Sequence, residues 1–173
     1  MTALITRINT LYARIPNELI TLVARFSIAA VFWKSGQTKV ENFAVDLFDW
    51  NWRIGWPHFS DSVVGLFRDE YHLPLLPPEV AAFMAAGAEH VFSTLILIGL
   101  VTRLSATALL FMTLTIEILV YPDAYPTHGV WAANLLFLMK NGAGALSLDR
   151  LALNWFGRAH ASVLSITPAA APR

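Results

Sequence analysis

The sequence contains no cysteine among its 173 residues. This absence excludes disulfides, zinc–thiolate sites, thiolate-bound iron–sulfur clusters and a thiol nucleophile, so any redox chemistry must be supplied by a bound cofactor or a partner. Charge is scarce too, because Lys, Arg, Asp and Glu make up 14% of the chain and cancel to a net charge of zero. Nucleic-acid binding normally needs a basic face, so no nucleic-acid partner is expected. Zinc-protease and phosphate-loop motifs are also missing, and no metal site is predicted.

Hydrophobic residues are abundant at 56% of the chain, which favours a membrane protein. Four segments are long and apolar enough to span a hydrocarbon core, and polar breaks rich in Pro, Gly and Asp separate them. Their limits are 17–38, 79–100, 104–121 and 127–141. The fourth is the weakest because its apolar centre, VWAANLLFLM, is short. We therefore predict one all-α membrane domain, 1–173, built as a four-helix bundle.

The positions of Lys and Arg predict the orientation of this bundle. With the N-terminus inside, the cytoplasmic side receives Arg7, Arg14, Arg103, Lys140, Arg150, Arg158 and Arg173, as the positive-inside rule requires. Both termini are therefore expected to be cytoplasmic. Arg7 and Arg14 precede the first apolar run as in a signal peptide, but Arg25 interrupts that run and no cleavage site follows it, so we expect a retained span.

Two segments outside the spans carry aromatic residues. The external loop 39–78 contains Trp50, Trp52 and Trp56, and tryptophan favours the headgroup layer. Within this loop an amphipathic helix is predicted from Ser60, so the loop is expected to be partly structured and to form a lid. After the fourth span, 147–157 is typical of a cytoplasmic interfacial helix, and 165–173 of a loose tail.

Ionisable residues inside the spans are costly, normally paired and functional by default. Arg25 and Glu89 both fall near the midplane of antiparallel spans, so we predict that they pair, either as a structural clasp or as part of a functional polar core. The alanine-rich face around Glu89 indicates that it points into the bundle. His90 and Asn134 complete this candidate core, and for His90 a structural role is favoured over a proton relay.

A second candidate cluster lies at the outer ends of the spans. Lys34, Glu117, His128 and Trp131 are predicted to form a site for protons or a polar head group. For Lys34 and His128, snorkelling to the interface is the alternative. The stripe of His128, Trp131 and Asn134 suits a quinone, because it offers an aromatic wall with few polar points; the alternative for Trp131 is an interfacial anchor. Because His90 and His128 differ in depth by more than a helical turn, no haem is expected, and the lack of cysteine excludes covalent attachment.

Three stretches resemble the DoxX family of four-span bacterial membrane proteins: ARFSIAAVFWKSGQTKV, AEHVFSTLILIGLVTRLSATAL and YPDAYPTHGVWAANLLFLMKNGAGALSLDRL. By position, the family pattern matches Arg25, Gly36, Lys39, Glu89, Arg103, Gly142, Gly144 and Asp149, while GAG replaces the commoner GPG turn. The resemblance implies a bacterial inner-membrane protein, in some members associated with quinone-linked sulfur oxidation or oxidative-stress complexes. It does not imply that the chain is itself an enzyme.

Three functions remain open at this level. The first is a membrane subunit of a quinone-linked redox system. The second is a non-catalytic scaffold that recruits a soluble or periplasmic enzyme through the aromatic loop 43–72 and the interfacial helix 147–157. The third, a small transporter or export factor, is disfavoured because no internal repeat supports alternating access. The expected partners are the lipid bilayer and an unidentified protein, with a homo-oligomer as a further option.

Overall fold

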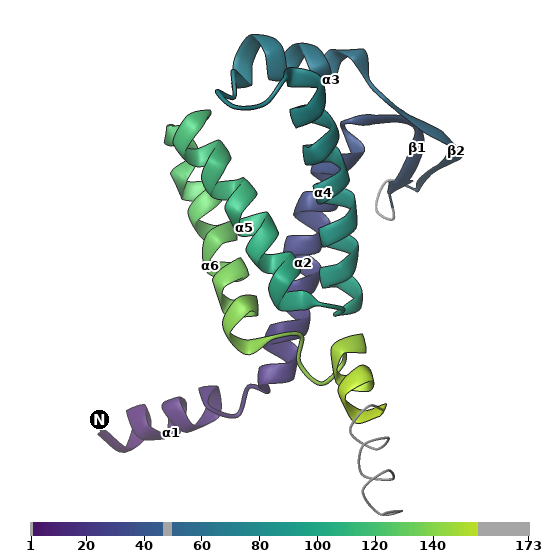
Figure 1. Cartoon of the computed structure of the whole chain (residues 1–173). Coiled ribbons are helices and arrows are strands. Elements are labelled where there is room, and N and C mark those ends of the chain that lie inside the picture. Colours follow the sequence, from purple (N-terminus) through teal and green to yellow (C-terminus); the bar gives the residue numbers. More distant parts are fainter. Residues whose placement is uncertain (1, 47–49, 156–173) are drawn as a thin grey trace, which may run out of the picture.

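The structure is a computed structural model that describes residues 2–46 and 50–155. Its main body consists of four long helices that run side by side (Figure 1). They are α2 (Asn17–Gln37), α4 (Pro78–Ile98), α5 (Thr102–Leu119) and α6 (Tyr125–Asn141). α2 packs mainly against α4, and α5 packs mainly against α6. Short connections on either side of α5 make it antiparallel to both of its neighbours in sequence.

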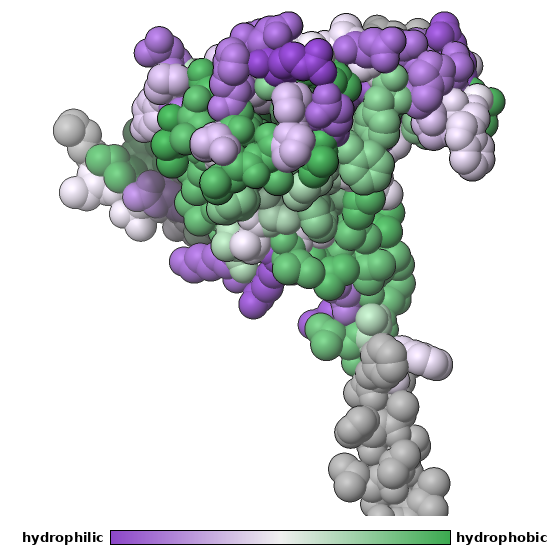
Figure 2. All heavy atoms as spheres, turned by 45° about the horizontal axis from the view of Figure 1, so that its top comes forward, coloured by the Kyte–Doolittle hydropathy of each residue, from purple (hydrophilic) through white to green (hydrophobic). Residues whose placement is uncertain are grey.

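Three of these helices are long and apolar enough to cross a membrane. α2 and α4 have 21 residues each and α5 has 18. Figure 2 shows hydrophobic residues along the sides of the helices and hydrophilic residues gathered at the end that carries α3. The chain is therefore a membrane protein. α6 has 17 residues, about 26 Å of helix, and falls outside the candidate spans found in the described part of the chain, so the four-span count stays a prediction.

An apolar core holds the four long helices together. Its members come from all four and are Ile28, Ala29, Phe32, Ile96, Ala106, Leu109, Leu135 and Leu138. Five of them are 0% exposed, so the helices interdigitate without leaving these side chains open to lipid. Truncating a large aliphatic side chain in such a core costs about 2–5 kcal/mol.

The all-α prediction is wrong for the first half of the external loop. Residues Val40–Asp46 form strand β1 and Asn51–Phe59 form strand β2, which pair antiparallel as a two-stranded hairpin. Alternating aromatic and β-branched residues favour strands. The pairing is irregular between Glu41 and Phe43, where Asn42 has a φ of 62°, a conformation that Asn tolerates better than most residues. The hairpin lies beside the ends of α2 and α4 (Figure 1).

The second half of the external loop forms a cap over α4. The helix predicted from Ser60 corresponds to α3 (Asp61–Leu66), and a π-helical turn, η1 (Phe67–Tyr71), continues it. Val63 and Phe67 pack against Ala81 and Ala82 of α4. Because these side chains are buried, the cap is part of the fold and is not a loose lid.

A polar contact joins this cap to the end of α5. The Tyr121 hydroxyl donates a hydrogen bond to Glu70, and the rings of Tyr71 and Tyr121 meet edge to face at 5.6 Å. The hydrogen bond to Glu70 is the main cause that raises the pKa of Tyr121. For Tyr71, burial is the main cause that raises the pKa. Both phenols therefore remain protonated, and Tyr121 remains a donor, at neutral pH.

Helix α1 (Thr2–Tyr12) and the described residues after α6 lie at the same end of the bundle, opposite the cap (Figure 1). Helix α1, which was not expected from the sequence, precedes α2 there. After α6, residues 148–155 are helical, within the interfacial helix predicted for 147–157. Residues 156 and 157 and the predicted tail, 165–173, lie outside the described residues. That this end faces the cytoplasm stays a prediction.

Candidate functional site

Glu89 lies in a buried ion pair with Lys39 and not with Arg25. Lys39 Nζ is 2.9 Å from Oε1 and 2.8 Å from Oε2 of Glu89. The Oε1 contact has hydrogen-bond geometry, whereas Oε2 has no hydrogen bond and is paired by charge alone. Ser35 donates to Oε1 at 2.9 Å and accepts from Lys39 Nζ at 3.1 Å. Only 9% of the Lys39 side chain and 4% of the Glu89 side chain are exposed, so the three residues form a closed and neutral cluster.

Arg25 instead holds backbone carbonyls at the opposite end of α4. Its Nε donates to Ile96 O at 2.9 Å and its Nη2 donates to Leu97 O. Its Nη1 donates to Ala143 O at 3.0 Å and Leu146 O at 2.6 Å. The last carbonyls of a helix lack internal donors and carry the negative end of the helix dipole. Arg25 therefore caps α4 and ties it to the segment after α6.

The predicted pairing of Arg25 with Glu89 was wrong because the register of α2 against α4 differs from the one assumed. The sequence argument placed both residues near the midplane by counting from the start of each span. In the structure Arg25 lies beside Ile96, and Ser35 lies beside Glu89. Ile96 follows Glu89 by about seven residues, so roughly 10 Å of helix separates the two polar sites. The amino-acid composition of two helices does not determine how far one helix is shifted along the other.

The remaining family-pattern residues at the Arg25 end also stabilise the backbone. The Asp149 carboxylate accepts from the N–H groups of Val101 at 2.8 Å and Thr102 at 3.1 Å, and so caps the start of α5. Arg103 donates to the Lys140 carbonyl at 3.3 Å, near the end of α6. The GAG turn that follows α6 depends on glycine, because φ is 77° at Gly142 and 76° at Gly144. Arg25, Arg103, Gly142, Gly144 and Asp149 thus form one structural clamp.

His90 bridges α4 to α2 and, through α2, to the hairpin. Val45 N–H donates to Gln37 Oε1 at 2.8 Å, which leaves Gln37 Nε2 to donate to His90 Nε2 at 2.8 Å. Since Nε2 accepts, the hydrogen must lie on Nδ1, which donates to Ala86 O at 2.8 Å. Both ring nitrogens are therefore engaged within the protein, which favours the structural role and leaves neither nitrogen free to ligate a haem iron.

Gly36 makes this approach possible. A Cβ on Gly36 would lie 2.8 Å from the His90 ring and 3.2 Å from Glu89 Cβ, well inside van der Waals contact. Gly36 therefore lets α2 and α4 pack closely enough to seal the ion pair. At this end of the bundle, as at the other, the family-pattern residues position backbone and helices.

The predicted outer cluster forms only in part. His128 Nδ1 lies 2.6 Å from Glu117 Oε2, and the His128 ring packs 5.0 Å from the Trp131 ring. Lys34 is elsewhere, 3.7 Å from Asp46 of the hairpin. The Glu117–His128 pair joins α5 to α6 and is largely buried, with side-chain exposures of 18% and 10%. Lys34 is not part of this pair.

Asn134 and Trp131 face the bundle interior. Asn134 Nδ2 donates to Ala24 O at 3.3 Å, while its buried Oδ1 has no partner. The Trp131 ring meets Phe32 edge to face at 5.6 Å. The stripe from His128 to Asn134 is thus a packed seam between α6 and α2, and the cavities described next lie elsewhere. In the described part of the chain, no three His, Asp or Glu side chains are placed to hold a metal.

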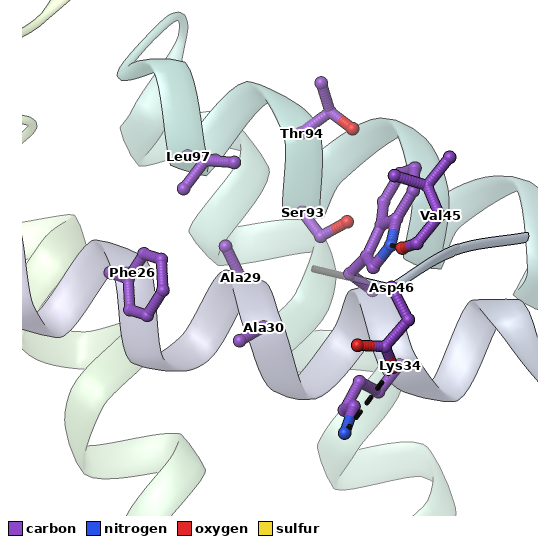
Figure 3. Close-up of a pocket in the computed structure, with 10 residues that line it drawn as sticks. Phe26, Ala29, Ala30, Lys34, Val45, Asp46, Ser93, Thr94 and Leu97 are labelled. Atoms are coloured by element: carbon purple, nitrogen blue, oxygen red, sulfur yellow. Dashed lines mark hydrogen bonds and ion pairs between the residues drawn. The ribbon is translucent and has the colours of Figure 1, made fainter. Parts of the chain in front are cut away.

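A groove between α2 and α4 is the first of two open sites described in this part of the bundle. Its volume is about 250 Å³, and its lining is almost wholly apolar. The lining residues are Phe26, Ala29, Ala30, Trp33, Lys34, Val45, Asp46, Ser93, Thr94 and Leu97. Figure 3 shows Lys34 and Asp46 at one end of the groove, with Phe26 and Leu97 toward the other. The groove therefore suits an amphiphile with one polar end.

A second cavity of about 360 Å³ lies beneath the base of the hairpin. Phe43, Phe59, Phe83 and His90 are among its lining residues. Trp33 separates this second cavity from the first groove. Its ring contacts Phe43 and His90, which line the second cavity, while Trp33 itself lines only the first groove. The hairpin thus helps to form both cavities.

Several residues of these sites were missed from the sequence. Trp33, Gln37 and Thr94 carry no charge and belong to no motif, so periodicity treated them as ordinary span residues. Ser35 precedes Lys39 by one helical turn, a spacing that could have suggested their contact. Val45 was unpredictable because its place in the groove depends on the hairpin.

Comparison with known proteins identifies the family of the chain. A family model described as DoxX matches residues 20–122. This region contains Arg25, Gly36, Lys39, Glu89 and Arg103 but ends before the GAG turn. An "Uncharacterized protein" of Haemophilus influenzae is 28% identical over 138 residues, covering 75% of this chain and 81% of the relative. No solved structure matches the chain.

Proposed function

The chain belongs to the DoxX family of membrane proteins, and on that premise we propose that it is an accessory subunit of a bacterial inner-membrane redox system that binds an isoprenoid quinone. The binding site is the groove between α2 and α4. One observation carries the proposal: an apolar groove between two helices long enough to span a membrane has a charged pair, Lys34 and Asp46, at one end. The relative from Haemophilus influenzae supports the bacterial part of this proposal.

The groove fits a quinone better than a wholly polar ligand. Apolar side chains line its length, and Phe26 and Leu97 at one end are 48% and 46% exposed, so an isoprenoid tail could leave the groove there and continue into the bilayer. A volume of about 250 Å³ holds one substituted ring with the first part of such a tail. At the other end Lys34 can donate to a quinone carbonyl, whereas the Thr94 hydroxyl already donates to His90 O at 2.7 Å and offers only acceptor lone pairs.

The chain's own residues would bind and orient the ring, while the quinone supplies the capacity to accept electrons and protons. The partner oxidoreductase would deliver the electrons, because the chain lacks cysteine-based electron carriers. Catalysis by this chain alone is not part of the proposal. The scaffold hypothesis assigns the hairpin to a protein partner, and the labelling experiment described below distinguishes that role.

The test compares two alanine-to-phenylalanine variants. Ala30 is half-buried in the groove, whereas Ala133 is exposed on α6 away from it. Wild type, Ala30→Phe and Ala133→Phe are purified in a mild detergent, and the quinone extracted per mole of protein is measured by chromatography. We expect Ala30→Phe to lose most of the bound quinone, and Ala133→Phe to retain it.

A second measurement titrates each protein with a short-tailed ubiquinone analogue by calorimetry. Ala30→Phe should weaken binding by about tenfold or more, equivalent to about 1.4 kcal/mol, and Lys34→Gln should weaken it less. Equal binding by both phenylalanine variants would refute the groove as the site. If no quinone co-purifies and none binds wild type, the proposed function itself is wrong.

A further inference from the structure

The hairpin has one apolar and one more polar face. Residues paired directly across antiparallel strands project to the same side, and successive pairs alternate between sides. The apolar pairs are Phe43 with Ile54 and Val45 with Trp52, and the alternate pairs are Ala44 with Arg53 and Asp46 with Asn51. The sheet therefore carries its large hydrophobic side chains on one side.

On β1 the apolar face is turned toward α2 and α4. The Phe43 ring lies 6.4 Å from the Trp33 ring and 6.5 Å from the His90 ring. Val45 is fixed at both backbone groups, since its N–H donates to Gln37 at 2.8 Å and its carbonyl accepts from Trp33 at 2.9 Å. These contacts set the orientation of the whole hairpin.

On β2 the same apolar face extends past the edge of the helices. Ile54, opposite the half-buried Phe43, is 84% exposed, and Trp52, opposite Val45, is 53% exposed. At the base of β2, Phe59 meets Phe83 of α4 at 5.2 Å between ring centroids. Phe83 is itself 61% exposed on a helix that can span the membrane. Phe43, Phe59 and Phe83 line one cavity, so the apolar face of the hairpin meets the side of α4 that carries Phe83.

We propose that the Trp52–Ile54 face of β2 lies in the headgroup layer of the bilayer, so that the hairpin is a membrane-surface anchor beside the bundle. Tryptophan favours that layer. The outer edge of β2 has backbone groups without a strand partner in the hairpin, and these cannot be satisfied in hydrocarbon but can be by headgroups and interfacial water. The alternate residues Asn51 and Arg53 then face water. The ligand of this face is the lipid surface itself. Quinone binding in the groove does not depend on this contact between the hairpin and lipid.

Adjacent residues on opposite faces provide the test. The chain has no cysteine, so Ile54→Cys and Arg53→Cys each give a single labelling site. Each variant is labelled with an environment-sensitive fluorophore and reconstituted into vesicles of phosphatidylcholine and phosphatidylglycerol. Quenching is then measured with lipids that carry a doxyl group either near the headgroup or near the chain end.

We expect the Ile54 label to be quenched at least about twofold more than the Arg53 label by the shallow doxyl group, as expected for a side chain in the interfacial layer. The deep doxyl group should quench the Ile54 label less. Trp52→Cys and Asn51→Cys form a second pair on the same two faces, which guards against a local disturbance at residue 54. Thermal unfolding of all four labelled proteins should match that of wild type.

Three results would overturn the proposal. Equal quenching of the Ile54 and Arg53 labels would show that the apolar face of the hairpin is not turned toward the lipid. Efficient disulfide cross-linking between Ile54→Cys chains, without lipid quenching, would assign the face to a second copy. Protection of Ile54→Cys from a water-soluble maleimide only after the soluble cell fraction is added would assign it to a protein partner, as the scaffold hypothesis requires. None of these results depends on quinone binding.

Discussion

The ion pair between Lys39 and Glu89 predicts a specific pattern of energetic coupling. Two unit charges 2.8 Å apart attract by about 6 kcal/mol at an effective dielectric constant of about 20. Desolvation of both ions offsets much of this attraction, but removing one partner leaves the other buried and costs about 3–5 kcal/mol. Lys39→Met and Glu89→Gln should therefore each destabilise the bundle by about 3 kcal/mol.

The double variant should be much less destabilised than the sum of the two single variants, because neither charge is then left alone. We expect an interaction energy of about 2–3 kcal/mol between Lys39 and Glu89. Arg25 shares no partner with Glu89 and donates to backbone carbonyls about 10 Å of helix away. The cycle of Arg25→Met with Glu89→Gln should therefore give an interaction energy within about 0.5 kcal/mol of zero.

Equilibrium unfolding in mixed detergent and SDS micelles, followed by tryptophan fluorescence, measures all six proteins under one set of conditions. An interaction energy near zero for Lys39 and Glu89 would refute the assignment of the pair. A large interaction energy between Arg25 and Glu89 would show that α2 and α4 adopt the register expected from the sequence and not the one described above.

Three further outcomes follow from the contacts at the two ends of the bundle. Arg25→Lys should lose at least about 3 kcal/mol of unfolding free energy, because an ammonium cannot reach four carbonyls in the guanidinium geometry and hydrogen bonds to charged groups contribute about 1.5–3 kcal/mol each. The same SDS titration measures this loss. Unchanged stability of Arg25→Lys would contradict the role of Arg25 as the cap of α4. Asp149→Ala should cost about 1 kcal/mol, and Asp149→Asn less, as expected for an N-cap; equal losses would show that charge and not capping matters. Gly36→Leu should separate α2 from α4 and raise the rate of proteolysis in the hairpin, whereas Gly87→Leu, whose Cβ meets nothing within 4 Å, should leave that rate unchanged.

The sequence was sufficient to predict the helices that span the membrane and the presence of polar residues inside them. Long apolar runs bounded by Pro, Gly and Asp have few alternatives in a bilayer, because every backbone group must be satisfied within the helix. Because a charged side chain is costly in contact with lipid, the burial of Arg25 and Glu89 inside the bundle could be predicted from their positions alone. The amphipathic helix after Ser60 was predictable from local periodicity.

The partners of those polar residues could not be predicted in the same way. Lys39 follows α2 and was assigned to an external loop, yet its long side chain reaches back one turn to Glu89 and Ser35. The stagger of α2 against α4 decides this contact, and it depends on close packing at Gly36. The separation of Lys34 from Glu117 and His128 likewise depends on which helices are neighbours.

The sequence by itself determined that this is a membrane protein, where its long apolar helices lie and which side chains need polar partners. It could do so because hydrophobicity and the cost of buried charge act locally. Only the tertiary structure decided that Arg25 and Glu89 contact partners at opposite ends of α4, that residues 40–46 and 51–59 pair as two strands, and that this hairpin closes a groove beside α2. Each of these depends on the relative shift and facing of elements distant in sequence, which many weak packing contacts set together.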